Sequence, residues 1–239
     1  IMLKNLFKKT KNNKYFNSTT YFIKADFLKI YNNYFKEFKN KKINILEIGI
    51  DTGNSLKFWK NYFSKNSNII GIDIKKYNFS DKKIYTYQGR QEDTVFLSNI
   101  TKKFKKFDII IDDGSHDCKH ILKSFNFLFN HLRNDGIYII EDLQTSYYPR
   151  YNGSRINLKK NHTSMNFLKS LTDSINYENY DQPFPKTSIY DGKIKFVHFF
   201  QNLAIVKKGL SKKIHYNHKN KQKNFLKKLL SKIINFNRI

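Results

Sequence analysis

The 239 residues contain a single cysteine, Cys118, and no long apolar stretch. One cysteine excludes a disulfide within the chain and favours a reducing compartment. No apolar run approaches the roughly 18–20 residues that cross a bilayer, and residues 2–9 lack the apolar core of a signal peptide. We therefore expect a cytoplasmic location. The histidines and the lone cysteine lack zinc-ligand spacing, so no zinc site is predicted.

Acidic residues are scarce: 19 stand against 45 basic residues, which gives a net charge of +26. Much of the excess lies at the two ends, since residues 1–14 and 207–239 contain 5 and 11 basic residues and no acidic residue. A basic domain can bind nucleic acid, but the chain has no arginine-rich stripe and no known nucleic-acid motif. A nucleic-acid partner is therefore not favoured.

The C-terminal segment 221–234 combines an apolar stripe with flanking lysines. This pattern predicts a basic amphipathic helix. Such a helix either lies on an anionic membrane, which would add a peripheral location at the inner face of the membrane, or docks on the protein itself.

Strand and helix patterns alternate along a chain that is 39% hydrophobic, as in globular proteins. Short apolar runs predict strands at 43–49, 68–73, 83–88, 107–112 and 137–140. Apolar positions at helical spacing predict helices at 21–38, 56–63, 94–104, 118–132 and 163–176. Residues 133–136 are predicted to form a turn, and two last strands, 188–197 and 199–207, a closing antiparallel hairpin. The alternation predicts an α/β fold with a Rossmann-like, doubly wound, mostly parallel seven-stranded sheet.

Acidic side chains follow two of these strands at the point where each strand ends. Asp112 and Asp113 end the strand at 107–112, and Glu141 and Asp142 follow the strand at 137–140. Parallel strands would deliver them to one sheet edge, where open α/β sheets bind ligands. Asp113, Glu141 and Asp142 could be helix caps. However, these three carboxylates would repel one another at one edge unless a divalent cation joined them. Oxygen ligands favour Mg²⁺, Mn²⁺ or Ca²⁺ over Zn²⁺.

A glycine-rich turn, residues 49–55, joins the first strand to the next helix. Glycine lets a ligand lie against the backbone, as in nucleotide-binding loops. Asp73 ends the second strand, where it could accept hydrogen bonds from a ribose diol or merely cap the next turn. The spacing is not Gly-x-Gly-x-x-Gly, so a cofactor without a pyrophosphate fits better.

Five segments, taken together, resemble the metal-dependent sugar O-methyltransferases, a family of class I S-adenosylmethionine-dependent methyltransferases. The resemblance covers roughly residues 43–150 and is carried by residues 47–63, 71–74, Gln91, 112–116 and 140–142. It implies a methyltransferase domain over residues 41–209. A basic lead-in with an N-terminal helix, residues 1–40, would precede it, and the basic amphipathic tail, residues 210–239, would follow.

The resemblance also implies the functional residues. S-adenosylmethionine would be bound by Glu47, Gly49, Thr52, Gly53, Ser55, Asp73, Gln91 and Asp112. A divalent metal, Mg²⁺ before Mn²⁺, would be held by Asp113, Glu141 and Asp142. Catalysis would use Asp113 and His116, with His116 as the general base, since a histidine has a reference pKa of about 6.5. Arg90 departs from the family, which usually has an acidic residue there.

The sequence therefore predicts an O-methyltransferase that acts on a sugar hydroxyl of a surface polysaccharide, capsular or lipo-, or of its nucleotide-activated precursor. Two alternatives stay open: a metal-dependent glycosyltransferase, and a basic protein that binds RNA or anionic lipid through an inactive methyltransferase-like core. Residues 143–186 are expected to help form the pocket for a small-molecule or glycan acceptor. Their tyrosines either stack on a sugar or lie there by chance: Tyr147, Tyr148 and Tyr151. A homo-oligomer is compatible with the resemblance.

Overall fold

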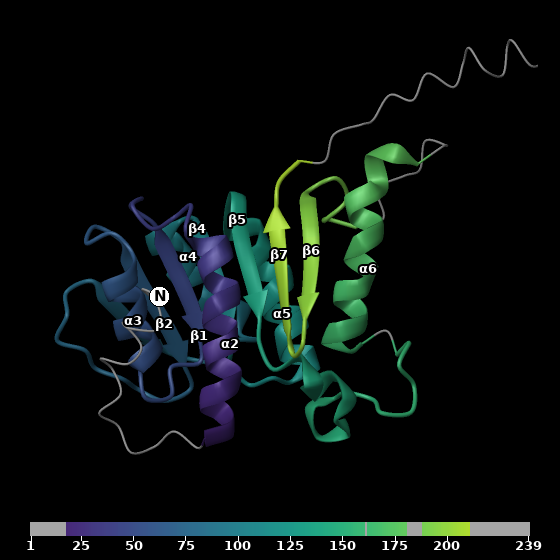
Figure 1. The fold of residues 1–239 in the computed structure, drawn as a ribbon, viewed down its shortest axis with the longest axis horizontal. Coiled ribbons are helices and arrows are strands. Elements are labelled where there is room, and N and C mark those ends of the chain that lie inside the picture. Colours follow the sequence, from purple (N-terminus) through teal and green to yellow (C-terminus); the bar gives the residue numbers. More distant parts are fainter. Residues whose placement is uncertain (1–17, 161, 181–187, 211–239) are drawn as a thin grey trace, which may run out of the picture.

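The computed structural model describes residues 18–160, 162–180 and 188–210, and within them a seven-stranded sheet (Figure 1). The strand order is β3-β2-β1-β4-β5-β7-β6. Neighbours among β1 to β5 pair in parallel, whereas β7 is antiparallel to both β5 and β6. The predicted fold class is confirmed. The strands are β1 (Asn44–Ile48), β2 (Asn68–Asp73), β3 (Ile84–Gln88), β4 (Phe107–Asp112), β5 (Leu132–Ile140), β6 (Ile194–Phe200) and β7 (Leu203–Lys208).

Helices cover both faces of the sheet, which is why the central strands are apolar on both sides. On one face lie α2 (Ser18–Phe35) and α3 (Asn54–Tyr62), which contribute an aromatic cluster to the core: Tyr31, Phe35, Trp59 and Phe63. Figure 1 shows α2 crossing this face. The other face is covered by α4 (Thr94–Phe104), α5 (Cys118–Leu128) and α6 (Ser164–Asn176). Short 3-10 helices are η1 (Phe129–His131), η2 (Leu143–Tyr147), η3 (Pro149–Tyr151) and η4 (Tyr177–Asn179).

The prediction of a turn at residues 133–136 is wrong, because these residues lie within β5. Leu132 pairs with Phe107 and Ile137 pairs with Ile109, so the register shifts between the two pairs. The extra residues of β5 bulge outward and are exposed at 133–135. Pairing on both sides of the bulge keeps the segment in the sheet.

The closing hairpin is confirmed, but its first strand begins later than predicted. Residues 188–193 form a turn, and β6 starts at Ile194. The buried Asp191 holds this turn, since its Oδ1 accepts from the Ser174 hydroxyl at 2.7 Å and its Oδ2 from the Ser188 N–H at 3.0 Å. These side-chain hydrogen bonds replace strand pairing at this point.

The basic segments 1–17 and 211–239 lie outside the described residues, and so does the amphipathic helix predicted at 221–234. Within the described ranges, no helix is both long enough and apolar enough to cross a bilayer.

Candidate active site

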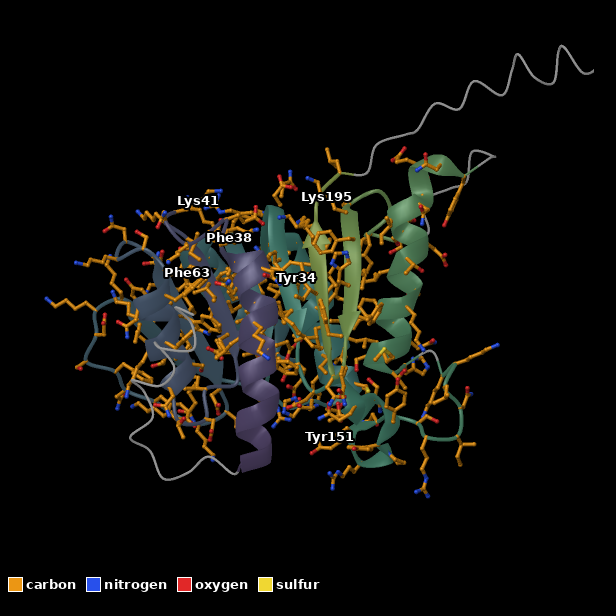
Figure 2. The ribbon with its side chains drawn as sticks, in the orientation of Figure 1. Tyr34, Phe38, Lys41, Phe63, Tyr151 and Lys195 are labelled. Atoms are coloured by element: carbon orange, nitrogen blue, oxygen red, sulfur yellow. The ribbon has the colours of Figure 1, made fainter. Side chains whose placement is uncertain are left out.

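The acidic residues predicted to converge do follow neighbouring strand ends. Asp112 of β4 pairs with Ile140 of β5, so the residues after them emerge side by side. The Glu141 N–H donates to the Asp112 carbonyl at 2.9 Å, and the Asp113 N–H donates to the carbonyl of Ile48, the last residue of β1, at 3.0 Å. The carboxyl ends of β1, β4 and β5 therefore form one edge. Figure 2 labels Tyr151 at this lower edge of the molecule.

Three of the predicted residues come together at this edge: Asp113, His116 and Asp142. Each offers a potential ligand atom, and these atoms lie within 4.8 Å of one another. His116 Nε2 is 3.5 Å from Asp142 Oδ2. Both residues have left-handed backbones, with φ of 57° and 52°. Such conformations are costly for non-glycine residues and concentrate at functional sites. The group is half-buried.

Glu141 lies beside this group but is not among its three members. Its side chain is buried, and its Oε1 accepts a hydrogen bond from the Tyr31 hydroxyl of α2. Burial first, and then the charges of Glu141, Asp113 and Glu47, raise the pKa of Tyr31 well above its usual value. Three carboxylates thus act on the pKa of one phenol, which indicates that negative charge is concentrated around Tyr31. Sequence analysis missed Tyr31, because it occupies an apolar position of its helix like any core residue.

The predicted cofactor loop contacts the acidic edge directly. Gly49 has φ +90°, and a Cβ there would lie 2.1 Å from the Asp113 carbonyl oxygen. Only glycine permits both this conformation and this approach. Gly53, with φ +71°, precedes α3, whose first turn has no side-chain cap. Among the described residues, the buried Asn54 Nδ2 has no hydrogen-bond partner. This end of α3 therefore offers donors to an anionic group.

Four other predicted cofactor residues lie within this loop or beside it. Thr52 is exposed and Ser55 is half-buried. Asp73 accepts hydrogen bonds from the Ile50 N–H and the Lys75 N–H, each at 2.8 Å. Glu47 is buried and accepts from Trp59 Nε1 at 3.1 Å. Asp73 thus supports the glycine loop. Each of the two Asp73 carboxylate oxygens accepts one of these hydrogen bonds and can accept another from a ligand.

Gln91 and Asp112, also predicted to bind the cofactor, lie buried beneath the loop after β4. Gln91 Oε1 accepts from the Ser115 N–H at 2.7 Å, while its Nε2 donates to Asp112 Oδ1 at 3.0 Å. Ser124 Oγ donates to Asp112 Oδ2 at 2.9 Å. Burial raises the pKa of Asp112 to about 6, opposed by the hydrogen bonds from Ser124 and Gln91. This network holds the loop that carries Asp113 and His116.

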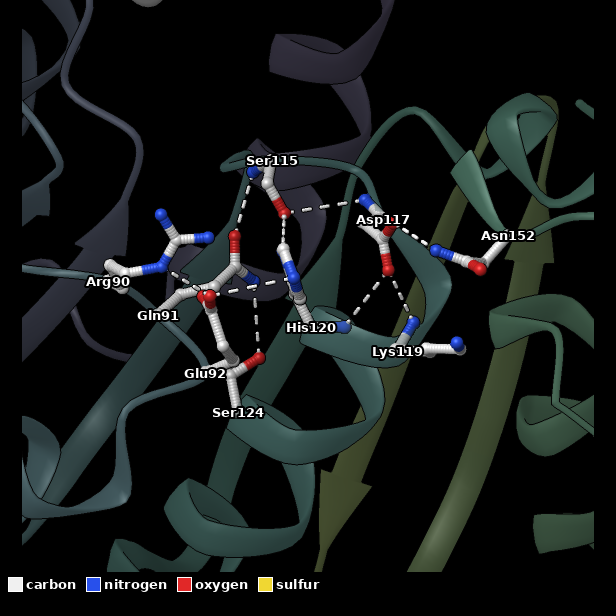
Figure 3. Close-up of polar contacts among 9 residues, drawn as sticks. All are labelled: Arg90, Gln91, Glu92, Ser115, Asp117, Lys119, His120, Ser124 and Asn152. Carbon is white, nitrogen blue, oxygen red and sulfur yellow. Dashed lines mark hydrogen bonds and ion pairs between the residues drawn. The ribbon is translucent and has the colours of Figure 1, made fainter. Parts of the chain in front are cut away.

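A second polar network, which sequence analysis missed, flanks the loop (Figure 3). The Ser115 hydroxyl lies 3.0 Å from His120 Nδ1, and His120 Nε2 lies 3.5 Å from Glu92 Oε1. Arg90 Nε donates to the same Glu92 oxygen at 2.6 Å. Arg90, the departure from the family pattern, is therefore paired with a carboxylate two residues away.

The segment after β5 folds over His116. The Thr145 hydroxyl donates to the His116 carbonyl at 3.0 Å, and the Tyr151 ring lies edge-on to the His116 ring, 6.5 Å between centroids. Tyr147 and Tyr148 are exposed, at 37% and 42%. Of the three loop tyrosines, Tyr151 is thus in ring contact with the histidine.

No family model matches the chain. It is 36% identical over 192 residues to the 8-demethyl-8-(2-methoxy-alpha-L-rhamnosyl)-tetracenomycin-C 3'-O-methyltransferase of Streptomyces olivaceus, covering 77% of this chain and 49% of that protein. It is 37% identical over 188 residues to the mycinamicin VI 2''-O-methyltransferase of Micromonospora griseorubida, covering 75% and 47%. The chain thus spans about half the length of the curated relatives it matches.

A solved structure is similar over most of this chain. It is the MycE methyltransferase from the mycinamycin biosynthetic pathway in complex with Mg and SAH, with a TM-score of 0.77 and 34% identity. The match covers 87% of this chain and 54% of that chain. The resemblance inferred from the sequence motifs is confirmed by these matches.

Proposed function

Because the chain belongs to the sugar O-methyltransferase family, we propose that it transfers the methyl group of S-adenosylmethionine to a sugar hydroxyl with the help of a divalent metal. The single observation that carries the proposal is the group formed by Asp113, His116 and Asp142 next to the glycine loop of β1. A proton acceptor, acidic metal ligands and a cofactor loop then share one sheet edge, which is what metal-assisted methyl transfer to a hydroxyl would use.

The acidic residues fit a hard divalent cation. Asp113, Glu141 and Asp142 would hold it, since carboxylate oxygens are the ligands that Mg²⁺ and Mn²⁺ prefer. The concentration of charge around Tyr31 supports this assignment, because converging carboxylates need a counter-charge. When bound, the metal would lower the pKa of the acceptor hydroxyl.

The glycine loop fits S-adenosylmethionine. The uncapped first turn of α3 and the unpartnered Asn54 amide offer donors suited to the carboxylate of an amino acid moiety. Asp73 offers acceptors suited to a ribose diol. When bound, the cofactor supplies an activated methyl group.

His116 would take the proton of the sugar hydroxyl. Its Nε2 stands 3.5 Å from Oδ2 of Asp142, one of the proposed metal ligands, so the base and the metal would lie side by side. The Thr145 hydroxyl donates to the His116 carbonyl and so holds the backbone that carries this ring. General-base help of this kind typically contributes about 10²–10⁴ in rate.

The finer substrate assignment is also a proposal. The two curated relatives are named for a rhamnosyl tetracenomycin and for mycinamicin VI. For this chain we propose a sugar of a surface polysaccharide or of its nucleotide-activated precursor. Mass spectrometry of reactions with a panel of nucleotide sugars tests it: a mass increase of one methylene unit identifies the acceptor, whereas methylation of neutral glycosylated natural products alone would reject it.

Metal removal and one substitution test the mechanism. EDTA should abolish turnover and Mg²⁺ or Mn²⁺ should restore it. His116→Ala should lower the rate by about 10²–10⁴ while calorimetry shows unchanged Mg²⁺ and S-adenosylhomocysteine binding. The matched control is His131→Ala, a half-buried histidine whose Nδ1 lies 3.2 Å from the Lys105 carbonyl oxygen. Full activity in EDTA, or loss of metal binding in His116→Ala, would contradict these assigned roles.

A further inference from the structure

Beside His116 the segment after β5 presents an arginine that lies over two tyrosine rings. The Arg150 guanidinium carbon lies 5.6 Å from the Tyr148 ring centroid and 5.1 Å from the Tyr151 ring centroid. The two rings are 6.4 Å apart. Tyr151 in turn meets the His116 ring. The cluster of Tyr148, Arg150 and Tyr151 therefore runs outward from the catalytic histidine.

This cluster stands on a tightly bonded backbone. The Gly153 N–H donates to the Tyr148 carbonyl at 3.1 Å, and the Ser154 N–H donates to the Ser146 carbonyl at 2.9 Å. A Cβ at Gly153 would lie 2.5 Å from that Ser146 oxygen, so the turn requires glycine. Asn152 also donates from its side chain to Asp117, the cap of α5. The tyrosines and the arginine are thus held on a preformed platform.

Within the described residues, no carboxylate pairs with Arg150. Its guanidinium contacts the two tyrosine rings instead. Two other arginines, by contrast, are paired with carboxylates: Arg90 with Glu92, and Arg133 with Asp108. A guanidinium that lies over aromatic rings keeps N–H groups for an oxyanion, and the ring contacts limit the side-chain entropy lost on binding. Arg150 is exposed and can be reached by a ligand.

We propose that the cluster of Tyr148, Arg150 and Tyr151 binds an oxyanion of the acceptor, next to the sugar hydroxyl that His116 deprotonates. The inference rests on the proposed function and deepens it, because it restricts the acceptor to an anionic sugar compound. A diphosphate linked to the sugar and a carboxylate on the sugar share this chemistry. The binding experiment below distinguishes these two sources.

Calorimetric titration of the full chain, saturated with Mg²⁺ and S-adenosylhomocysteine, provides the test. The probes are uridine diphosphate, methyl glucuronoside and the neutral methyl glucoside. We expect one anionic probe to bind at least about tenfold tighter than methyl glucoside, and Arg150→Gln to remove at least about tenfold of that affinity. Preference for uridine diphosphate assigns the phosphate source, and preference for the glucuronoside assigns the carboxylate source.

Arg155→Gln is the matched control. Arg155 is exposed in the same segment, and its substitution removes the same charge while leaving Arg150 and the two rings in place. It should change affinity by no more than about twofold. Equal losses in the two variants, or anionic probes that bind no tighter than methyl glucoside, would overturn the inference. Methyl transfer without any anion preference would leave the proposed function standing alone, whereas Arg150-dependent binding without methyl transfer would do the reverse. Unfolding temperatures of both variants show whether the platform remains folded.

Discussion

Replacing Tyr31 with phenylalanine removes one hydroxyl from the buried side of the proposed metal site. Tyr31 is 3% exposed and its hydroxyl donates to Glu141, which is 7% exposed. The ring stacks on Phe35 at 5.1 Å and lies 5.9 Å from Trp59. Phenylalanine keeps those ring contacts, so Tyr31→Phe isolates the loss of the hydrogen bond.

The expected effect follows from burial and charge. A hydrogen bond to a charged group contributes about 1.5–3 kcal/mol. In a chain of this size that loss should lower the unfolding temperature by about 3–12 °C. Residues that orient a metal ligand typically contribute about 10–100-fold to metal affinity. Tyr31→Phe should therefore weaken Mg²⁺ binding by about that factor, because the Glu141 carboxylate loses a donor that fixes its direction.

Tyr34→Phe is the matched control for this experiment. Tyr34 follows one turn later on α2, and its hydroxyl lies 2.8 Å from His198 Nδ1 at an exposed position. This substitution should cost less than about 1 kcal/mol and leave Mg²⁺ binding unchanged. Thermal unfolding in EDTA and calorimetric Mg²⁺ titration measure the two quantities. Equal effects of both variants would refute the reasoning, and a lowered unfolding temperature with unchanged Mg²⁺ affinity would make Tyr31 merely structural.

Three further outcomes are expected. Asp73→Ala should weaken S-adenosylhomocysteine binding by about 1–3 kcal/mol, and unchanged affinity in calorimetry would remove Asp73 from the cofactor site. Gly49→Ala should cost more than about 1 kcal/mol in stability and also lower cofactor affinity, because its Cβ meets the Asp113 carbonyl; Gly209→Ala, which meets only the flexible Lys195 side chain, should be tolerated. Asp112 has a folded pKa of about 6, above its value of 3.8 in the unfolded chain, so it contributes stability below pH 4 that is lost as the pH rises through 6. Metal-free protein should lose about 3 kcal/mol over that interval relative to Asp112→Asn, and parallel pH profiles of the two proteins in chemical denaturation would count against the raised pKa.

Features that depend on residues close together in the chain could be predicted from the sequence. The strand before Asp113 and the strand before Glu141 are short apolar runs, and parallel strands must release their last residues at the same edge. The glycine loop was also predictable from nearby residues, because glycine marks a backbone conformation that other residues avoid. These local signals, combined with one topological rule, determined the fold class and where to look for the site.

Contacts between distant segments were decided only by tertiary structure. Tyr31 and Glu141 are 110 residues apart, and an apolar helical pattern does not distinguish a tyrosine that packs from one that also donates a hydrogen bond. The bulge of β5 was hidden as well, since residues 133–136 have turn chemistry and only the pairing of Leu132 and Ile137 with β4 keeps the segment in the sheet. Tyr151 meets the His116 ring because the segment after β5 folds over the loop after β4. Sequence specifies the chemical groups and their local backbone, whereas packing of the chain determines which of those groups meet.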